Sequence, residues 1–485
     1  MKKTHNKKNS VASSLLYKFF ERLGIKGIGF VISVILARLL DPEIFGLVAI
    51  IIAVNSIAQT FVDSGLSTAL VQNKSANDAD YSTVFYISFG ISAFLYVILF
   101  FCAPLIATYY ELDGLVMPFR VLSLTLLFYS YNSIQVAKLT REMQFSKMFA
   151  CNMTVTVLTG TIGVVMAYKG FGLWSLVFYY LSNSILSCVA YMIVEKWRPK
   201  LVFSVSRAKE LFNYGYKILI SGLLCSIFSN IRTFIIGKMY SPTDLGYYNR
   251  GEQIPSIVST TMDSVFSSVM LPVYARAQGN KQRVCSMLSR TVSLNSFINF
   301  TAMFGLAAVA APLVQLLYTE KWMFCVPYLQ ILSLANLTVS IFSPCLVTIK
   351  AVGRSDIYLK LEVVRRIVMV GILLLSLCFH LLIAIAIGWL ISTIVDVAII
   401  LVPIKKLVGY SWCDQFRDVL PSLLISIVMC GIVYCVSLFN LPTVVILILQ
   451  LFVGMGVYLG IAWLFRVKNL TYLLSKFKSY LAQKG

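Results

Sequence analysis

The feature that most constrains this chain is a series of apolar segments, each about 20 residues long, separated by short polar turns. A helix rises about 1.5 Å per residue, so a segment of about 20 residues crosses a hydrocarbon core of roughly 30 Å. We identify about fourteen such segments, at residues 15–37, 43–64, 81–104, 115–137, 146–168, 172–194, 213–236, 244–271, 288–317, 323–349, 360–378, 381–404, 419–438 and 441–465. Hydrophobic residues make up 59% of the chain and charged residues 13%, which excludes an ordinary soluble domain. The predicted fold class is an all-α polytopic membrane protein.

The basic residues predict how the chain is oriented. With the N-terminus on the cytoplasmic side and alternating spans, about 31 Lys and Arg residues fall on the cytoplasmic side and about 5 on the outer side. The formal charge of +21 is therefore explained by topology, and we set a nucleic-acid partner aside. We expect both termini to be cytoplasmic, with the first span retained because no signal-peptide cleavage site follows the basic start.

Motifs for catalysis, cofactors and metals are lacking in the sequence. The 11 cysteines form no CxxC pair, and the two histidines, His5 and His380, lie far apart. We find no HExxH motif, nucleophile elbow or P-loop, and the outer connections are short. The sequence therefore predicts no enzyme, no cofactor and no metal site.

A repeat relates the two halves of the chain. The turn "ARLLDPEIFG" at 37–46 returns as "GKMYSPTDLG" at 237–246, an offset of 200 residues. Further matches keep the same order while the offset grows slowly, as in "APLI" at 103 and "APLV" at 311. An ordered series of this kind indicates an internal duplication.

The repeat predicts the architecture. Each copy holds six spans, an even number, so two six-helix lobes are related by a pseudo-two-fold axis along the membrane normal. The predicted parts are an N-terminal lobe at 1–194, a cytoplasmic linker at 195–217, a C-terminal lobe at 218–404, and two further helices with a tail at 405–485. The basic linker contains a segment that could lie as an amphipathic helix on the inner leaflet.

The repeated turn is interpreted as structural. Proline ends one span and starts the next, because it fixes φ and disfavours helix in the preceding residue. We expect Gly46 and Gly246 to let helices approach closely.

Charged residues within the first span are the main functional clue. Lys18, Arg22 and Lys26 recur at every fourth position and share one helical face with Glu21. Lys26 lies about 16 Å along the helix from residue 15, close to the membrane midplane. Lys18 and Arg22 could simply reach the cytoplasmic headgroups, with Glu21 neutralising one of them. The alternative is a cationic stripe that lines a water-filled cavity and binds an anionic substrate.

Further candidates lie in later spans. Arg232 and Arg250 are predicted to be cavity cations, and Glu252 is a secondary candidate beside Arg250. For these residues, an internal salt bridge and contact with substrate both remain open. Asp396 is more isolated in its span and is a candidate for binding a coupling ion. Arg would offer bidentate contact to phosphate, and Lys a point charge.

The segments "VISVILARLLDPEIFGLVAI", "FVDSGLSTALVQ" and "FIIGKMYSPTDLGYYNRGEQIP" resemble Wzx-type polysaccharide flippases. These form a branch of the multidrug/oligosaccharidyl-lipid/polysaccharide exporter superfamily. The resemblance implies a multi-pass protein of the bacterial inner membrane that moves undecaprenyl-pyrophosphate-linked oligosaccharides outward by alternating access. It implies a role in O-antigen, capsule or exopolysaccharide assembly, beside a polysaccharide polymerase and a chain-length regulator. Related flippases carry basic residues in a central cavity, for which Arg22, Lys26, Arg232 and Arg250 are the matching candidates here.

Two other functions remain open. An ion-coupled small-molecule exporter of the same fold would favour acidic residues in its cavity, whereas the buried set here is mainly basic. A scaffold for polysaccharide assembly that transports nothing would have no need for Lys26 at mid-depth.

Overall fold

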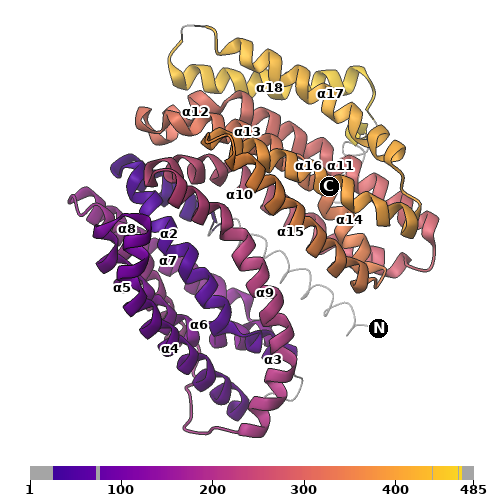
Figure 1. The fold of residues 1–485 in the computed structure, drawn as a ribbon. Helices are drawn as coiled ribbons and strands as arrows, with labels where there is room; N and C mark the ends of the chain where they lie inside the picture. The colour runs from indigo at the N-terminus through magenta and orange to yellow at the C-terminus, as the bar shows by residue number, and fades with distance from the viewer. Residues whose placement is uncertain (1–23, 25, 73–76, 440, 468, 472–485) are drawn as a thin grey trace, which may run out of the picture. The chain divides into compact units, whose positions relative to one another are not determined.

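The protein folds into helices, and no strand occurs among the residues that the structure describes (Figure 1). The structure is a computed structural model, and it describes residues 24, 26–72, 77–439, 441–467 and 469–471. The chain divides into two compact units, residues 1–246 and 247–485. The predicted all-α class is thereby confirmed.

The first unit contains the first nine named helices and the start of a tenth. Residues 26–39 are helical and precede the first labelled helix. The elements that follow are α2 (Pro42–Asp63), α3 (Leu66–Gln72), α4 (Asp78–Tyr110), η1 (Asp113–Leu115), α5 (Val116–Ser123), α6 (Thr125–Arg141), α7 (Phe145–Tyr168), α8 (Leu173–Val194) and α9 (Val205–Met239).

The second unit begins inside α10 (Pro242–Ala277), which runs on from the first unit. Its remaining elements are α11 (Lys281–Ala308), α12 (Ala310–Tyr318), η2 (Glu320–Cys325), α13 (Val326–Asn336), α14 (Val339–Ala351), α15 (Ser355–Leu377), α16 (Leu382–Val408), α17 (Trp412–Val436) and α18 (Thr443–Leu464). Its largest cores form where α11 packs against α14, α16, α17 and α18.

Eleven helical segments in the described part of the chain are long and apolar enough to cross a membrane. Each coincides with a span predicted from the sequence. The other three predicted spans are 15–37, which lies partly outside the described residues, 244–271 within α10, and 360–378 within α15. α10 and α15 are helical as expected, but each carries more charged residues than any of the eleven segments. The total of fourteen spans therefore stays a prediction.

Two predicted spans are each broken into two helices. The span at 115–137 is divided at Leu124 between α5 and α6, and the span at 323–349 is divided between α13 and α14 at residues 337–338. The first break falls on the last residue of "VLSL" at 121–124, and the second falls three residues after "ILSL" at 331–334. Each half of the chain therefore has a broken span, and the duplication remains a prediction.

Small residues let α9 pack closely along α2. A side chain added at Gly222 would meet Thr60 at 3.0 Å, and one at Gly237 would meet Ile50 at 3.1 Å. Between them, the Asn230 amide donates to Ser56 Oγ at 2.8 Å. These α9 positions are seven or eight residues apart, so they lie on one face of the helix. The contacts fix α9 within the first unit.

The two copies of the repeated turn lie against each other. A side-chain carbon at Gly46 would overlap the carbonyl oxygen of Pro242, and one at Gly246 would overlap the carbonyl oxygen of Pro42. Both contacts lie inside the first unit. Proline begins α2 and α10, so each helix starts against the glycine of the other. The close approach predicted for these glycines is therefore a contact between the repeats themselves.

The first unit extends further along the chain than the predicted N-terminal lobe. It ends at Gly246, whereas the predicted lobe ends at residue 194 and the predicted linker at 217. The linker residues from Val205 onward belong to the single helix α9, which contacts α2, α3 and α4. The two lobes and their symmetry axis remain a prediction.

The segment between α8 and α9 is held against the first unit. Trp197 is buried beside Tyr81, and the Arg207 guanidinium pairs with Asp80 at 3.0 Å. Lys138 of α6 pairs with Glu195 at 2.9 Å. Burial is the largest influence on Glu195 and raises its pKa. The hydrogen bond and charge of Lys138, a backbone hydrogen bond at Trp197 and the charge of Lys147 together outweigh burial and hold the pKa below its ordinary value. This pair stabilises the fold above the ordinary carboxyl pKa, and the contribution is lost as pH falls.

We predict that Gly46→Ala and Gly246→Ala each destabilise the protein by about 1–3 kcal/mol, because the new carbon overlaps backbone atoms that cannot rotate away. The matched control is Gly90→Ala in α4, where nothing lies within 4 Å. That change should stabilise the helix by up to about 1 kcal/mol. Thermal unfolding of the purified variants measures both effects, and equal shifts at the three positions would contradict the contact.

Candidate substrate-binding residues

Three of the predicted site residues, Lys18, Glu21 and Arg22, lie outside the described part of the chain. The remaining candidates are divided between the two units. Lys26 and Arg232 belong to the first unit, and Arg250, Glu252 and Asp396 belong to the second.

Lys26 lies in the helix that precedes α2 and is exposed. The later part of this helix packs into the core of the first unit through Ile32, Leu36 and Leu40. Lys26 is 13 residues before the helix ends at 39, a distance of about 20 Å along the axis. An exposed ammonium group at this depth is costly to place in hydrocarbon, and it is accessible to a ligand.

Arg232 lies in α9 and is half-buried. It follows Asn230, the residue that ties α9 to Ser56 of α2, by about half a turn. The helix ends at Met239, so Arg232 lies about 10 Å from that end. The seam with α2 fixes the backbone of α9 next to Arg232.

Arg250 is buried in the second unit, with only 5% of its surface exposed. Its guanidinium carbon lies 5.4 Å from the ring centres of both Tyr318 and Trp322, and Nη1 donates to the amide oxygen of Gln253. Aromatic faces attract cations, which stabilises the charge away from water. Glu252, two residues along α10, is half-buried. The surroundings of Arg250 give it a packing role in this state of the protein.

Asp396 is not isolated, as the sequence had suggested. Its Oδ2 atom accepts a hydrogen bond from Arg365 Nη2 at 2.8 Å, joining α16 to α15. The side chains of the two residues are 14% and 17% exposed. The expected isolation was wrong because the partner lies 31 residues earlier, on a different helix. The counter-charge that Asp396 needs is already supplied by the protein.

The pair belongs to a larger cluster of charges. Glu362 accepts from Arg365 at 3.0 Å and lies 3.7 Å from Arg366, and the Arg365 guanidinium lies 3.7 Å from the ring centre of Phe342. Two acidic and two basic residues balance one another, which lowers the cost of placing α15 among apolar helices. Sequence reasoning did not identify Arg365 as a half-buried, paired cation. A signal was present, because Glu362 lies three residues before Arg365 and four before Arg366, spacings at which opposite charges pair on a helix.

Metal binding has no support in the described residues, where no three His, Cys, Asp or Glu side chains gather in a group that could hold an ion. The ammonium and guanidinium groups among the candidates can recognise negative charge.

Comparison with known proteins identifies the family. A family model described as "Polysaccharide biosynthesis protein" matches residues 35–327. The chain belongs to this family. It is 26% identical to the succinoglycan biosynthesis transport protein ExoT of Rhizobium meliloti (strain 1021) over 85% of this chain and 82% of that protein. It is 23% identical to the lipopolysaccharide biosynthesis protein WzxC of Escherichia coli (strain K12), over 83% of this chain and 84% of that protein. The resemblance to Wzx-type flippases is confirmed.

Solved structures confirm the fold. The lipid II flippase MurJ in its inward closed conformation superimposes with a TM-score of 0.74 at 17% identity, covering 94% of this chain and 98% of MurJ. A MATE transporter in its straight conformation gives a TM-score of 0.51 at 16% identity, covering 80% of this chain and 94% of the transporter. By name, ExoT is a transport protein, in agreement with the prediction that this chain is not an enzyme.

We predict that Arg365→Met or Asp396→Leu alone destabilises the second unit by about 3 kcal/mol, because each leaves a charge without its partner in an apolar region. The double variant should lose about 1–3 kcal/mol less than the sum of the two. Thermal unfolding of the four proteins gives this coupling.

The matched control is the pair Arg354–Asp356, which has a similar distance of 2.7 Å but side chains 48% and 53% exposed. Its double-variant cycle should show no coupling beyond error. Strictly additive losses at Arg365 and Asp396 would contradict a paired, buried site.

Proposed function

We propose that the protein is a flippase that moves undecaprenyl-pyrophosphate-linked oligosaccharide repeat units from the cytoplasmic to the outer leaflet of the bacterial inner membrane. The product would serve assembly of a surface polysaccharide such as O-antigen, capsule or exopolysaccharide. Transport follows alternating access, in which the protein's binding site opens to one side of the membrane at a time. The charged group of the substrate thereby crosses without entering the hydrocarbon.

The observation that carries the proposal is an exposed lysine, Lys26, deep within an apolar helix of a protein with the flippase fold. A pyrophosphate cannot cross hydrocarbon without counter-charge, and an ammonium group supplies it. Arg22, one turn earlier on the same helical face, and Arg232 are the further cations proposed to contact the substrate. Arg250 would join them only after its aromatic neighbours move.

A cation-coupled exporter of small molecules is the second candidate. Asp396 was the residue predicted to bind a coupling ion, but its carboxylate is paired with Arg365. Binding a cation at Asp396 would require that pair to separate. The pairing therefore disfavours ion coupling at this position.

The partners that follow from the proposal are the lipid-linked oligosaccharide itself, membrane lipids, a polysaccharide polymerase and a chain-length regulator. Both termini would face the cytoplasm, where the basic residues gather. A scaffold that transports nothing would need the same partners but would not need Lys26.

We predict that Lys26→Gln lowers export of surface polysaccharide by about tenfold or more, because one charge-assisted contact to pyrophosphate contributes about 1.5–3 kcal/mol. Lipid-linked oligosaccharide should accumulate on the cytoplasmic side while the variant's abundance in the membrane stays normal. Quantifying both pools in cells that depend on the variant provides the test.

The control variant is Lys169→Gln, which removes an exposed charge in the turn between α7 and α8. It should leave export unchanged. Normal export with Lys26→Gln at normal abundance would favour a scaffold or a substrate without negative charge.

A further inference from the structure

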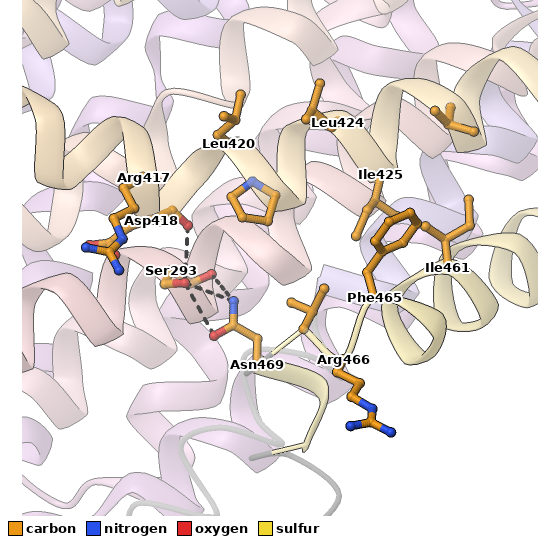
Figure 2. A pocket seen from close by; sticks show the side chains of 13 residues that line it. Ser293, Arg417, Asp418, Leu420, Leu424, Ile425, Ile461, Phe465, Arg466 and Asn469 are labelled. Atoms are coloured by element: carbon orange, nitrogen blue, oxygen red, sulfur yellow. Dashed lines mark hydrogen bonds between the residues drawn. The ribbon is translucent and has the colours of Figure 1, made fainter.

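Two adjoining cavities lie in the second unit, at the end where α11 and α17 begin and α16 and α18 finish. One has a volume of about 760 Å³ and is lined mainly by polar and basic side chains. The other has a volume of about 660 Å³ and is lined mainly by apolar side chains (Figure 2). Arg417 and Asp418 line both cavities. Together the cavities form one site with a polar half and an apolar half.

The polar half carries an excess of positive charge. Lys281 lies at the start of α11, Lys405 and Lys406 in the last turn of α16, and Arg417 in α17. Among the described residues, none of these four cations forms an ion pair or a side-chain hydrogen bond with another side chain.

The two acids in the polar half already have donors. Asp414 accepts from the backbone and hydroxyl of Ser411, which caps α17. Asp418 Oδ2 accepts from the Tyr410 hydroxyl at 2.9 Å. The two carboxylates offset part of the positive charge. The hydrogen bonds from Ser411 lower the pKa of Asp414, and Arg417 is near enough to help lower the pKa of that carboxyl. Four cations against two acids still leave an excess of positive charge, which suits a ligand that brings negative charge.

The apolar half is built by a turn that follows α18. Asn469 is buried, and its amide donates to the backbone oxygen of Ser293 at 3.1 Å and to Ser293 Oγ at 2.9 Å, which holds this turn against α11. Figure 2 shows Asn469 and Ser293 joined in this way, with Ile425 near Ile461 and Phe465 farther along the cavity. The wall that results offers aliphatic and aromatic surface over several helical turns.

A second unpaired arginine lies at the mouth of the apolar half. Arg466 is exposed, and no ion pair or hydrogen bond of its side chain occurs within the described residues. Its backbone ends α18 at φ 48°, a left-handed conformation that usually falls to glycine or asparagine. The helix dipole favours a positive charge beside the C-terminal end of α18, and the exposed side chain of Arg466 is also accessible at the mouth of the apolar half.

We infer that these two cavities form a binding site for one anionic phospholipid of the cytoplasmic leaflet. Its phosphate lies at Arg417, where the two cavities adjoin, and its polar headgroup enters the half lined by Lys281, Lys405 and Lys406. An acyl chain packs on the apolar wall, and Arg466 adds positive charge at the mouth of that half. Unpaired cations beside an apolar wall fit this ligand, since negative headgroup and hydrocarbon chain are joined in one molecule. The positive-inside bias assigns this end of the helices to the cytoplasmic side.

The test measures lipid binding directly and does not depend on transport. Purified full-length protein is titrated with short-chain phosphatidylglycerol and, separately, with phosphatidylcholine, and binding is followed by native mass spectrometry and thermal shift. The double variant Arg417→Gln/Arg466→Gln should bind phosphatidylglycerol about 30-fold more weakly than the wild type, two charges each contributing about a factor of five or six. Phosphatidylcholine should bind weakly to both proteins.

The matched control is Lys209→Gln/Lys360→Gln, which removes the same charge from two exposed positions outside the cavities. It should bind phosphatidylglycerol like the wild type. Equal loss in both double variants would overturn the site in favour of a general effect of surface charge.

Two further arms identify the source of the phosphate. Inorganic phosphate should give no thermal shift at concentrations where the phospholipid does, and a shift of equal size would overturn the lipid assignment. Undecaprenyl pyrophosphate should not displace phosphatidylglycerol from the wild type. Displacement would assign the cavities to the transported lipid instead.

Discussion

The contact between the two repeated turns is the constraint on which the first unit depends. Gly46 lies against the backbone of Pro242, and Gly246 against the backbone of Pro42, so neither glycine can carry a side chain without moving a helix start. α9, which leads to the second turn, packs along α2, which follows the first. Backbone contacts of this kind suit a membrane, where helices gain little from the hydrophobic effect and associate through close packing.

An unbalanced charge within an apolar helix is costly, and three charged sites of this protein are stabilised in three different ways. Arg365 and Asp396 neutralise each other across two helices, and Arg250 is stabilised by aromatic faces and an amide oxygen. Lys26 differs because it is exposed. The side chains packed around a buried charge keep ligands away from it, whereas the exposed ammonium group of Lys26 is accessible to one. This difference makes Lys26 the main candidate for contact with substrate.

The sequence was sufficient for features that depend on neighbours along the chain. The span limits follow from apolar runs, and the repeated turn from its proline and glycine, so α2 and α10 begin at the predicted prolines. Features that depend on distant residues were not predictable in the same way. The partner of Asp396 lies on another helix, and the seam between α9 and α2 joins residues about 170 positions apart, as in Asn230 and Ser56. The breaks at Leu124 and residues 337–338 carry no proline or glycine that could have indicated them.

The central claim, that the protein moves a pyrophosphate-linked saccharide by using a cation in its first span, is most directly tested by reconstitution. Purified protein in phospholipid vesicles would be given a lipid-linked pyrophosphoryl oligosaccharide or a matched lipid whose saccharide is attached without phosphate. Transfer to the opposite leaflet would be followed by the access of an added saccharide-binding protein. The account predicts protein-dependent transfer of the pyrophosphate lipid, little transfer of the neutral one, and selective slowing of the former by Lys26→Gln. Equal transfer of both lipids, unaffected by Lys26→Gln, would contradict it.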